Sequence, residues 1–360
     1  MKKNKLLALS MATVIALTSL NGCGKKNDVA EIDPVINVSA VPEMNSPEDM
    51  QVLYKDGYIL SDLTGEWIDE SLKNKRPLCI MINNIIDAMP QSGISKADIT
   101  YEMLVEGGIT RYLCVFRDYA NVGKLGPVRS ARPYYVEMTE MYDGFYGHVG
   151  WSTLAEEMIT NSDLPDLNGL TALSTIMYFR DESRVAPHNC YTNGESAVAG
   201  IEYMGYSTEH DSTYDKDMFK FNYKDKDLGT GKVANKITTA YSESRKPWFE
   251  YNAEDKRYYR FQYGEKQIDD QTGEQLSYKN VIIQFVQYTQ IDDYGLQLID
   301  WNPGGQAIYC TNGEYENIIW KKDNGVVKYY HADGTQLSMN PGNTFVTVFD
   351  QLLPQNVTIE

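Results

Sequence analysis

The last third of the chain alternates short apolar runs with dipeptides that favour tight turns. The stretch IIWKKDNGVVKYYHADGTQLSM contains three strand-like runs, joined at Asn324-Gly325 and Asp333-Gly334. These pairs supply the positive φ angles that two-residue hairpin turns require. The flanking runs KNVIIQFVQY and NTFVTVFD predict two further strands. We therefore expect a mainly antiparallel β domain, a small sheet or sandwich, over residues 237–352.

Residues 66–206 mix strand and helix patterns. PLCIMIN is typical of a buried strand, and RPYYVEMTEMY and TLAEEMITN have helical spacing. NGESAVAGIEYMG indicates a helix that ends at Gly205. The charged, aperiodic residues 207–236 suggest a linker. The predicted fold class is α+β, with an N-terminal mixed α/β-sheet domain followed by the β domain.

A hairpin is expected around Gly107-Gly108, in the run ADITYEMLVEGGITRYLCVFRD. A two-residue loop there pairs Glu106 with Ile109 and Leu104 with Arg111. Period-two alternation then predicts one face that carries Glu102, Glu106, Arg111 and Arg117. That face is either solvated, with ion pairs, or the floor of a polar cleft.

The first residues are typical of an exported protein. Three lysines precede an apolar run from Leu6 to Leu20, which is shorter than the roughly 20 residues of a membrane span. The following Leu-Asn-Gly-Cys is similar to a bacterial lipobox that ends at Cys23. We expect a signal peptide over residues 1–22 and a lipidated tether over residues 23–65, with acylated Cys23 holding the protein in the bilayer at the extracytoplasmic face of the cell membrane.

Charge and cysteine content narrow the function classes. The formal net charge of −17 disfavours nucleic acid as a partner, because nucleic-acid sites select basic patches. Cys79, Cys114, Cys190 and Cys310 are widely spaced and mostly in apolar surroundings, which favours buried free thiols over a disulfide framework. No cofactor motif is evident.

Arginine is distributed unevenly. Six of the ten arginines lie between Arg111 and Arg184, where Lys124 is the only lysine. Arginine is preferred where a planar group must make two contacts with a carboxylate or a phosphate. We therefore expect ordered, partly buried arginines in the first domain.

The motif GPVRSARP holds Arg129, Ser130 and Arg132 just before a predicted helix. Ser130 is expected to cap that helix, with Pro133 in its first turn. A helix start beside two arginines is also a favourable place for an anion. The predicted ligand-binding residues are Arg111, Arg129, Ser130, Arg132, His188 and Asn189.

Catalysis is left open by the sequence. His148 and His188 lie at predicted loop or strand ends, where functional groups gather. The catalytic candidates are therefore His148, His188 and Ser130, although no nucleophile elbow surrounds the serine. A zinc site built from His148, His188 and Cys190 lacks tight ligand spacing, so no metal is expected.

Four motifs together carry a family resemblance. EGGITR, GPVRSAR, APHN and DDQTGEQLSYKNVIIQ resemble the YerB-like lipoproteins of Gram-positive bacteria. The likeness spans roughly Lys75 to Asp350, and the lipobox agrees with it. It implies an anchored envelope protein of two domains and of unknown function, and it assigns no catalytic residue.

Three functional hypotheses follow. The first is an envelope binding or accessory protein whose arginines hold an anionic ligand or a cell-wall protein partner. The alternative is a hydrolase or transferase of a cell-wall polymer, with His148 or His188 as general base. In the third, the arginines are architectural and pair with Glu102, Glu106 or Asp118.

Overall fold

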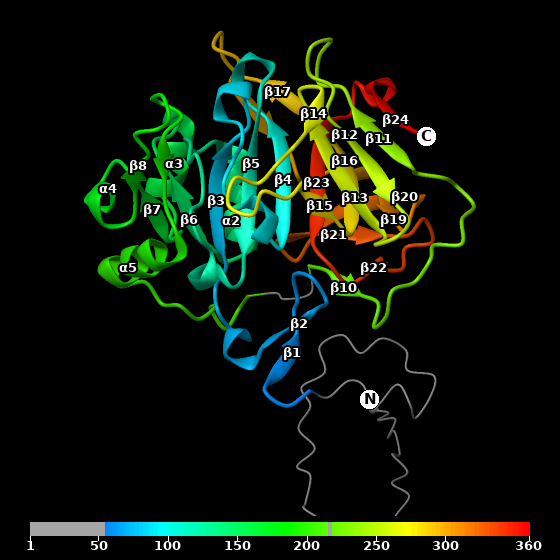
Figure 1. The fold of residues 1–360 in the computed structure, drawn as a ribbon, viewed down its shortest axis with the longest axis horizontal. Coiled ribbons are helices and arrows are strands. Elements are labelled where there is room, and N and C mark those ends of the chain that lie inside the picture. Colours follow the sequence, from blue (N-terminus) through cyan, green and yellow to red (C-terminus); the bar gives the residue numbers. More distant parts are fainter. Residues whose placement is uncertain (1–54, 215–217) are drawn as a thin grey trace, which may run out of the picture. The chain divides into compact units, whose positions relative to one another are not determined.

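A ten-stranded mixed sheet forms the centre of the structure. The computed structural model describes residues 55–214 and 218–360. Strands from the two ends of the sequence lie side by side in this sheet (Figure 1). In spatial order the strands are β21 (Val326–Tyr330), β20 (Glu314–Asp323), β19 (Gly305–Thr311), β16 (Asn280–Val286), β23 (Thr344–Asp350), β4 (Ile99–Leu104), β5 (Thr110–Phe116), β3 (Leu78–Asn83), β6 (Phe145–His148) and β7 (Asp166–Asn168).

The two halves of the chain meet at the pair β23–β4. These strands are parallel, with Thr344 opposite Ile99 and Thr347 opposite Glu102. On its other side β23 is parallel to β16 over seven residue pairs. The sequence patterns predicted most of these strands but not that one sheet would contain them all, because alternation shows which residues are buried and not which strands pair.

A second sheet and several short ladders complete the β structure. The second sheet follows the order β14, β13, β12, β11, β24, with β15 also pairing β13. Its strands are β11 (Lys236–Thr239), β12 (Trp248–Asn252), β13 (Arg257–Gln262), β14 (Glu265–Lys266), β15 (Ser277–Tyr278) and β24 (Val357–Ile359). Two-stranded ladders join β1 (Tyr58–Leu60) to β2 (Trp67–Asp69), β8 (Phe179–Arg180) to β9 (Cys190–Tyr191), β10 (Lys220–Phe221) to β22 (Ser338–Met339), and β17 (Tyr288–Gln290) to β18 (Gln297–Ile299).

Each face of the large sheet has its own core. Side chains alternate between the faces, so β3 sends Met81 to one core and Ile80 and Ile82 to the other. The first core is closed by α2 (Pro133–Met141) and α3 (Thr153–Thr160), which bury Tyr135 and Ile159 against it. The second core is closed by α4 (Leu173–Ile176), α5 (Gly194–Met204) and the second sheet (Figure 1). The fold is α+β, as predicted.

The predicted helices form, and α5 ends at Gly205 as expected. The Asn193 side chain accepts a hydrogen bond from the Ser196 amide at the start of α5, and Gly205 closes the helix in the left-handed conformation at φ 69°. Ser152 caps α3 in the same way. Within the part of the chain that the structure describes, no helix is long and apolar enough to cross a bilayer.

The predicted turn at Asn324-Gly325 is confirmed. Both residues have positive φ, 50° and 86°, and they join β20 to β21 in an antiparallel hairpin. At Asp333-Gly334 only Gly334 has positive φ, and the His331 amide donates to the Thr335 carbonyl across a loop longer than the expected two-residue turn. The strand after it also behaves differently. β22 pairs in parallel with β10, which comes from the segment predicted to be a linker.

The register predicted for the Gly107-Gly108 hairpin is wrong by one residue. Residues Glu106–Gly108 form a 3-10 turn within a longer loop, so Leu104 lies opposite Thr110 and Glu102 opposite Tyr112. A one-residue shift moves side chains to the other face of the sheet. Glu102 therefore lies on the face opposite to that of Arg111, and both faces are buried rather than one being solvated.

The cysteine prediction is confirmed for the described residues. Cys79, Cys114, Cys190 and Cys310 are free and buried. Burial raises the pKa of all four thiols, which keeps them protonated and unreactive at neutral pH.

Candidate functional site

The GPVRSAR motif fills a gap between two strands of the large sheet. β3 and β6 pair only as far as Ile80 and Gly147. Beyond that point the Arg129 amide donates to the Met81 carbonyl at 3.0 Å, and the Arg129 carbonyl accepts from the Val149 amide at 3.0 Å. At this end of the sheet the motif thus lies between β3 and the residue after β6 and hydrogen-bonds to both. The backbone N–H and C=O groups of Arg129 are therefore both held.

A glycine at the start of the motif permits this insertion. Gly126 has φ 148°, and a methyl group placed on it would lie 2.7 Å from the ring of Tyr191. The chain enters the gap against that ring, where any larger residue would clash.

Ser130 does not cap the following helix, which corrects that prediction. α2 begins at Pro133 with Arg132 as its N-cap residue, and no side chain caps it. The reason is that Ala131 is still held in the gap, because its backbone amide donates a hydrogen bond to the Gly150 carbonyl at 2.9 Å. The backbone of Ser130 instead serves the arginines, since its carbonyl accepts from Nη1 of Arg111 at 2.7 Å.

Arg111 is the most deeply buried of the predicted ligand-binding residues. It is the second residue of β5 and is only 6% exposed. Among the described residues, its side chain hydrogen-bonds to the Ser130 carbonyl. No carboxylate pairs with Arg111 among the described residues, and its Nε is buried without an acceptor.

Arg129 and His188 lie together beside the end of β3. Nη1 of Arg129 donates to the Pro187 carbonyl at a long 3.4 Å, and its Nε is buried without an acceptor. Nδ1 of His188 lies 2.7 Å from the Asn83 side-chain nitrogen. With Asn83 so oriented, Nδ1 accepts the hydrogen bond and Nε2 carries the proton. Asn83, which the sequence prediction missed, follows a buried strand and is opposite Arg111 in the β3–β5 pair.

Arg132 differs from its two neighbours because an acid neutralises it. Nε and Nη2 of Arg132 both bind the Glu106 carboxylate, the second at 2.6 Å. Burial would raise the pKa of Glu106, but the hydrogen bond and charge of Arg132 lower it below its ordinary value. The hypothesis of an architectural arginine therefore describes Arg132. Asp118, also considered as a partner, instead accepts from the Asn121 amide.

We call Arg111, Arg129, Arg132 and His188 the arginine cluster. The positive charge that they bring together lowers pKa values within it. Burial, then the charges of Arg132 and Arg129, lower the pKa of Arg111 to about 10. Burial, Arg132 and Arg180 lower the pKa of Arg129, and burial and Arg129 lower that of His188. Cations that depress each other's pKa lie close together. The charge of Glu106 acts in the opposite direction on Arg111, but the pKa of Arg111 is still lowered. An anion placed among them would relieve this repulsion.

Asn189 lies at the margin of the cluster. Its side-chain oxygen accepts from Nη1 of Arg180 at 3.0 Å, in the loop that also carries His188. The structure thus brings together Arg111, Arg129, Arg132 and His188, with the Ser130 backbone between them, while Asn189 positions a further arginine.

His148 does not belong to the arginine cluster. It is fully buried, its Nε2 is 2.7 Å from Asp166, and its Nδ1 is 2.8 Å from the Gly150 carbonyl. Both ring nitrogens face oxygen acceptors, so neither is free to take a proton from a substrate. Within residues 55–214 and 218–360, no hydrogen bond joins the Ser130 hydroxyl to a histidine, and no group of three or more His, Cys, Asp or Glu residues is arranged to hold a metal.

We expect His148→Ala to lower the free energy of unfolding by about 1–3 kcal/mol, because it removes two buried hydrogen bonds. Denaturant unfolding measures this loss. A His148→Ala variant as stable as the wild type would show that these two hydrogen bonds do not hold the fold.

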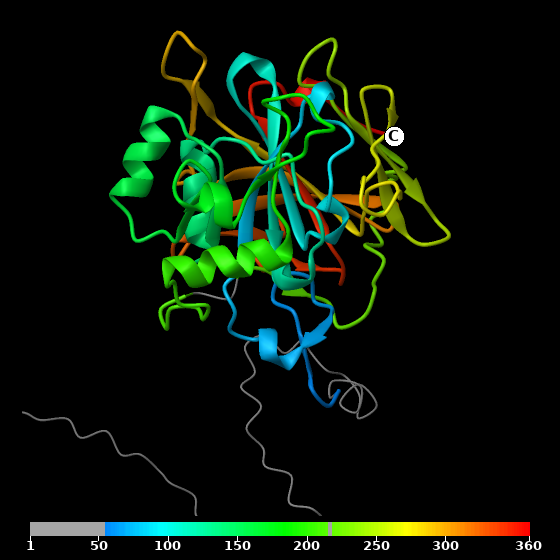
Figure 2. The same cartoon turned by 60° about the vertical axis from the view of Figure 1, so that its left-hand side comes forward.

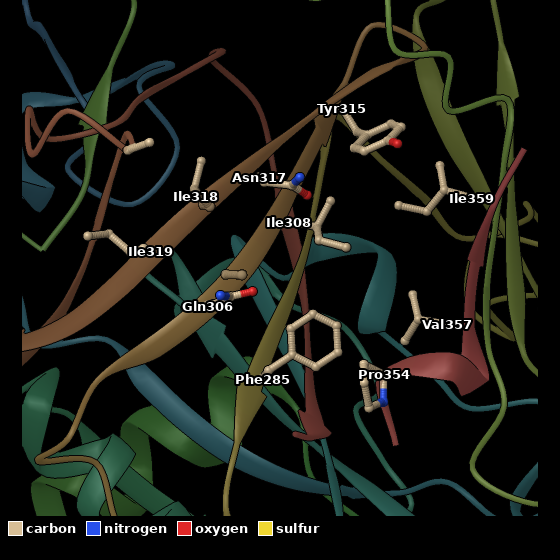
Figure 3. Close-up of a pocket in the computed structure, with 12 residues that line it drawn as sticks. Phe285, Gln306, Ile308, Tyr315, Asn317, Ile318, Ile319, Pro354, Val357 and Ile359 are labelled. Atoms are coloured by element: carbon tan, nitrogen blue, oxygen red, sulfur yellow. The ribbon is translucent and has the colours of Figure 1, made fainter. Parts of the chain in front are cut away.

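A hollow of about 580 Å³ lies elsewhere, between the large sheet and β24. Figure 3 shows Phe285, Ile308, Val357 and Ile359 around it. None of its lining residues is charged, and none belongs to the arginine cluster. Gln306, Tyr315 and Asn317 add polar groups to its apolar lining, but it offers no positive charge that would attract an anion.

Comparisons with known proteins agree with this architecture. Two family models, the N-terminal and C-terminal domains of "Protein of unknown function (DUF3048)", match residues 63–207 and 237–346. The chain is 31% identical over 297 residues to "Putative lipoprotein YerB" of Bacillus subtilis (strain 168), covering 81% of this chain and 86% of that protein. The crystal structure of YerB from Bacillus subtilis superposes with a TM-score of 0.75 and 28% identity, over 84% of this chain and 99% of that one. On this evidence the chain belongs to the DUF3048 family, whose two domains it contains.

Proposed function

We propose that this protein is a lipid-anchored binding protein on the extracytoplasmic face of the cell membrane, and that Arg111, Arg129 and His188 hold an anionic group of an envelope ligand. The anchor rests on the sequence around Cys23, which lies outside the described residues, and on the similarity to a relative named as a lipoprotein. The observation that carries the binding role is the pair Arg111 and Arg129. Among the described residues, neither has a carboxylate partner.

The ligand group is a phosphate or a carboxylate. Guanidinium groups bind both through paired N–H donors, and a partly buried site strengthens each contact. His188 adds a neutral Nε2–H donor, because its lowered pKa leaves the ring uncharged at neutral pH. Glu106 is already neutralised by Arg132, so it does not cancel the attraction.

The hydrolase or transferase alternative finds no comparable support. His148 has no free nitrogen, and Nδ1 of His188 already accepts a hydrogen bond from Asn83. Binding an anion requires only positive charge and hydrogen-bond donors, which the arginine cluster contains.

The proposal is tested by titrating inorganic phosphate, and separately glucuronate, into the purified lipoprotein in detergent micelles. We expect saturable binding by calorimetry, which Arg129→Met weakens about 10- to 100-fold through the loss of charge-assisted hydrogen bonds. The methionine keeps an apolar stem of similar length.

Arg76→Met is the matched control. Arg76 pairs with Asp143 at 3.1 Å and precedes β3, whereas Arg129 lies beside the other end of that strand. This control should bind both anions as the wild type does. Wild-type affinity in a folded Arg129→Met variant, or no saturable binding of either anion by the wild type, would refute the proposal.

A further inference from the structure

A second hollow lies beside Glu106, the carboxylate partner of Arg132. It has a volume of about 430 Å³ and lies between the β4–β5 loop and the β17–β18 hairpin, which Figures 1 and 2 show at the same end of the molecule. Gly107, Gly108 and Gly295 line it, all with positive φ. Glycines leave the backbone bare, so a ligand can approach the wall closely.

The rim of this hollow is aromatic and polar. The ring of Tyr294, at the tip of the hairpin, is 88% exposed. Asp293 beside it has no partner among the described residues, and Gln290, Gln297 and Asp350 also line the hollow. An exposed ring provides a flat apolar surface, carboxylates accept hydrogen bonds from hydroxyl groups, and amides both accept and donate them.

Glu106 separates the hollow from the arginines. A methyl group placed on Gly295 would lie 3.8 Å from the Cα of Glu106, so the hairpin packs directly on this residue. The carboxylate of Glu106 binds Arg132, and its charge also acts on Arg111. One ligand that extends past Glu106 would therefore reach both places.

We propose that the hollow binds a sugar ring of a negatively charged carbohydrate whose acidic group occupies the arginine cluster. This inference rests on the proposed function, because it names the class of ligand that the cluster holds. Tyr294 stacks on the sugar, and Asp293 and the glutamines bind its hydroxyl groups. The volume lies within the range of roughly 300–1,000 Å³ typical of small-ligand sites.

The charges favour a carbohydrate over other anionic ligands. Asp293 and Asp350 repel a phosphodiester backbone that would continue through the hollow, but they accept hydrogen bonds from hydroxyl groups. A lipid chain gains little in this polar hollow. The ligand that fits is neutral and hydroxylated at the hollow and anionic at the arginines.

The test is an array of immobilised oligosaccharides of equal length that are neutral, uronate-bearing or phosphate-bearing, probed with the purified lipoprotein. We expect the acidic members to be retained and the neutral ones to be retained at least tenfold less. Tyr294→Ala should weaken binding to an acidic oligosaccharide about five- to tenfold and leave inorganic phosphate binding unchanged. Tyr203→Ala, which removes an exposed tyrosine from α5, is the matched control and should have no effect.

The outcomes separate this inference from the function on which it rests. If inorganic phosphate binds but no acidic oligosaccharide is retained, or if Tyr294→Ala behaves like Tyr203→Ala, the inference is overturned and the anion site remains. Equal retention of neutral and acidic oligosaccharides also overturns it. If phosphate and acidic oligosaccharides both fail to bind, the proposed function falls as well.

Discussion

Replacing Glu102 with glutamine is expected to lower the free energy of unfolding by about 3–5 kcal/mol, since it leaves a buried charge unpaired. Glu102 and Arg260 are both 0% exposed, and Nη2 of Arg260 donates to Glu102 at 2.6 Å. The other carboxylate oxygen accepts from Asn84 at 3.0 Å and from Thr110 at 2.8 Å. The pair joins the large sheet to β13 of the second sheet, so its loss should weaken both.

Two further variants make this prediction specific. Glu243→Gln removes an exposed ion pair with Lys246 and should change stability by less than about 1 kcal/mol. The double variant Glu102→Leu, Arg260→Met replaces both charges with apolar groups and should be more stable than Glu102→Gln. Chemical unfolding of the three variants measures these differences in the free energy of unfolding. A loss below about 1 kcal/mol for Glu102→Gln would show that the pair adds little.

A pH dependence is expected from Asp98, at the junction of β23 and β4. Burial raises the pKa of this carboxyl from its ordinary value to about 7. A hydrogen bond from the Arg117 backbone amide, at 2.6 Å, and the charge of Arg117 oppose the rise. Asp62 and Glu66 add to the increase. The folded protein therefore holds a proton that the unfolded chain releases near pH 4. Its stability should fall as the pH rises from about 4 to 7, by roughly 4 kcal/mol from this group alone.

Asp98→Asn isolates this effect, because the amide stays neutral and its oxygen can still accept from Arg117. The difference in unfolding free energy between wild type and variant should shift in favour of the variant as the pH rises from 4 to 8. A difference that does not change with pH, or that shifts toward the wild type, would contradict the raised pKa.

The sequence predicted turns and helix ends well where the residue type itself determines the backbone conformation. Asn324-Gly325 requires a primed turn, and Asn193 and Gly205 mark the two ends of α5. The hairpin at Gly107-Gly108 failed because two glycines fit a longer loop equally well, and only packing selects the register. The pairing of β23 with β4 depends on residues about 250 positions apart, which no local pattern reveals.

The candidate site was predicted in part, for a similar reason. The excess of arginine over lysine correctly indicated ordered guanidinium groups, but their partners come from distant segments. Arg117 is bound by Asp62 and Arg260 by Glu102, whereas Arg129 has no acidic partner among the described residues. Spacing along the chain does not separate these cases. The contribution of Asn83 was missed because it depends on the contact with His188, across 105 residues.

The central claim is that Arg111 and Arg129, which have no carboxylate partner among the described residues, bind an external anion. Its most direct test is the nitrogen-15 spectrum of arginine side chains in the labelled protein during a titration with inorganic phosphate. We predict that the Nε–H signals of Arg111 and Arg129 shift saturably, while those of Arg117 and Arg260, whose Nη2 atoms already bind carboxylates, remain in place. Unmoved signals from Arg111 and Arg129, or parallel small shifts of all ten arginines, would contradict the account.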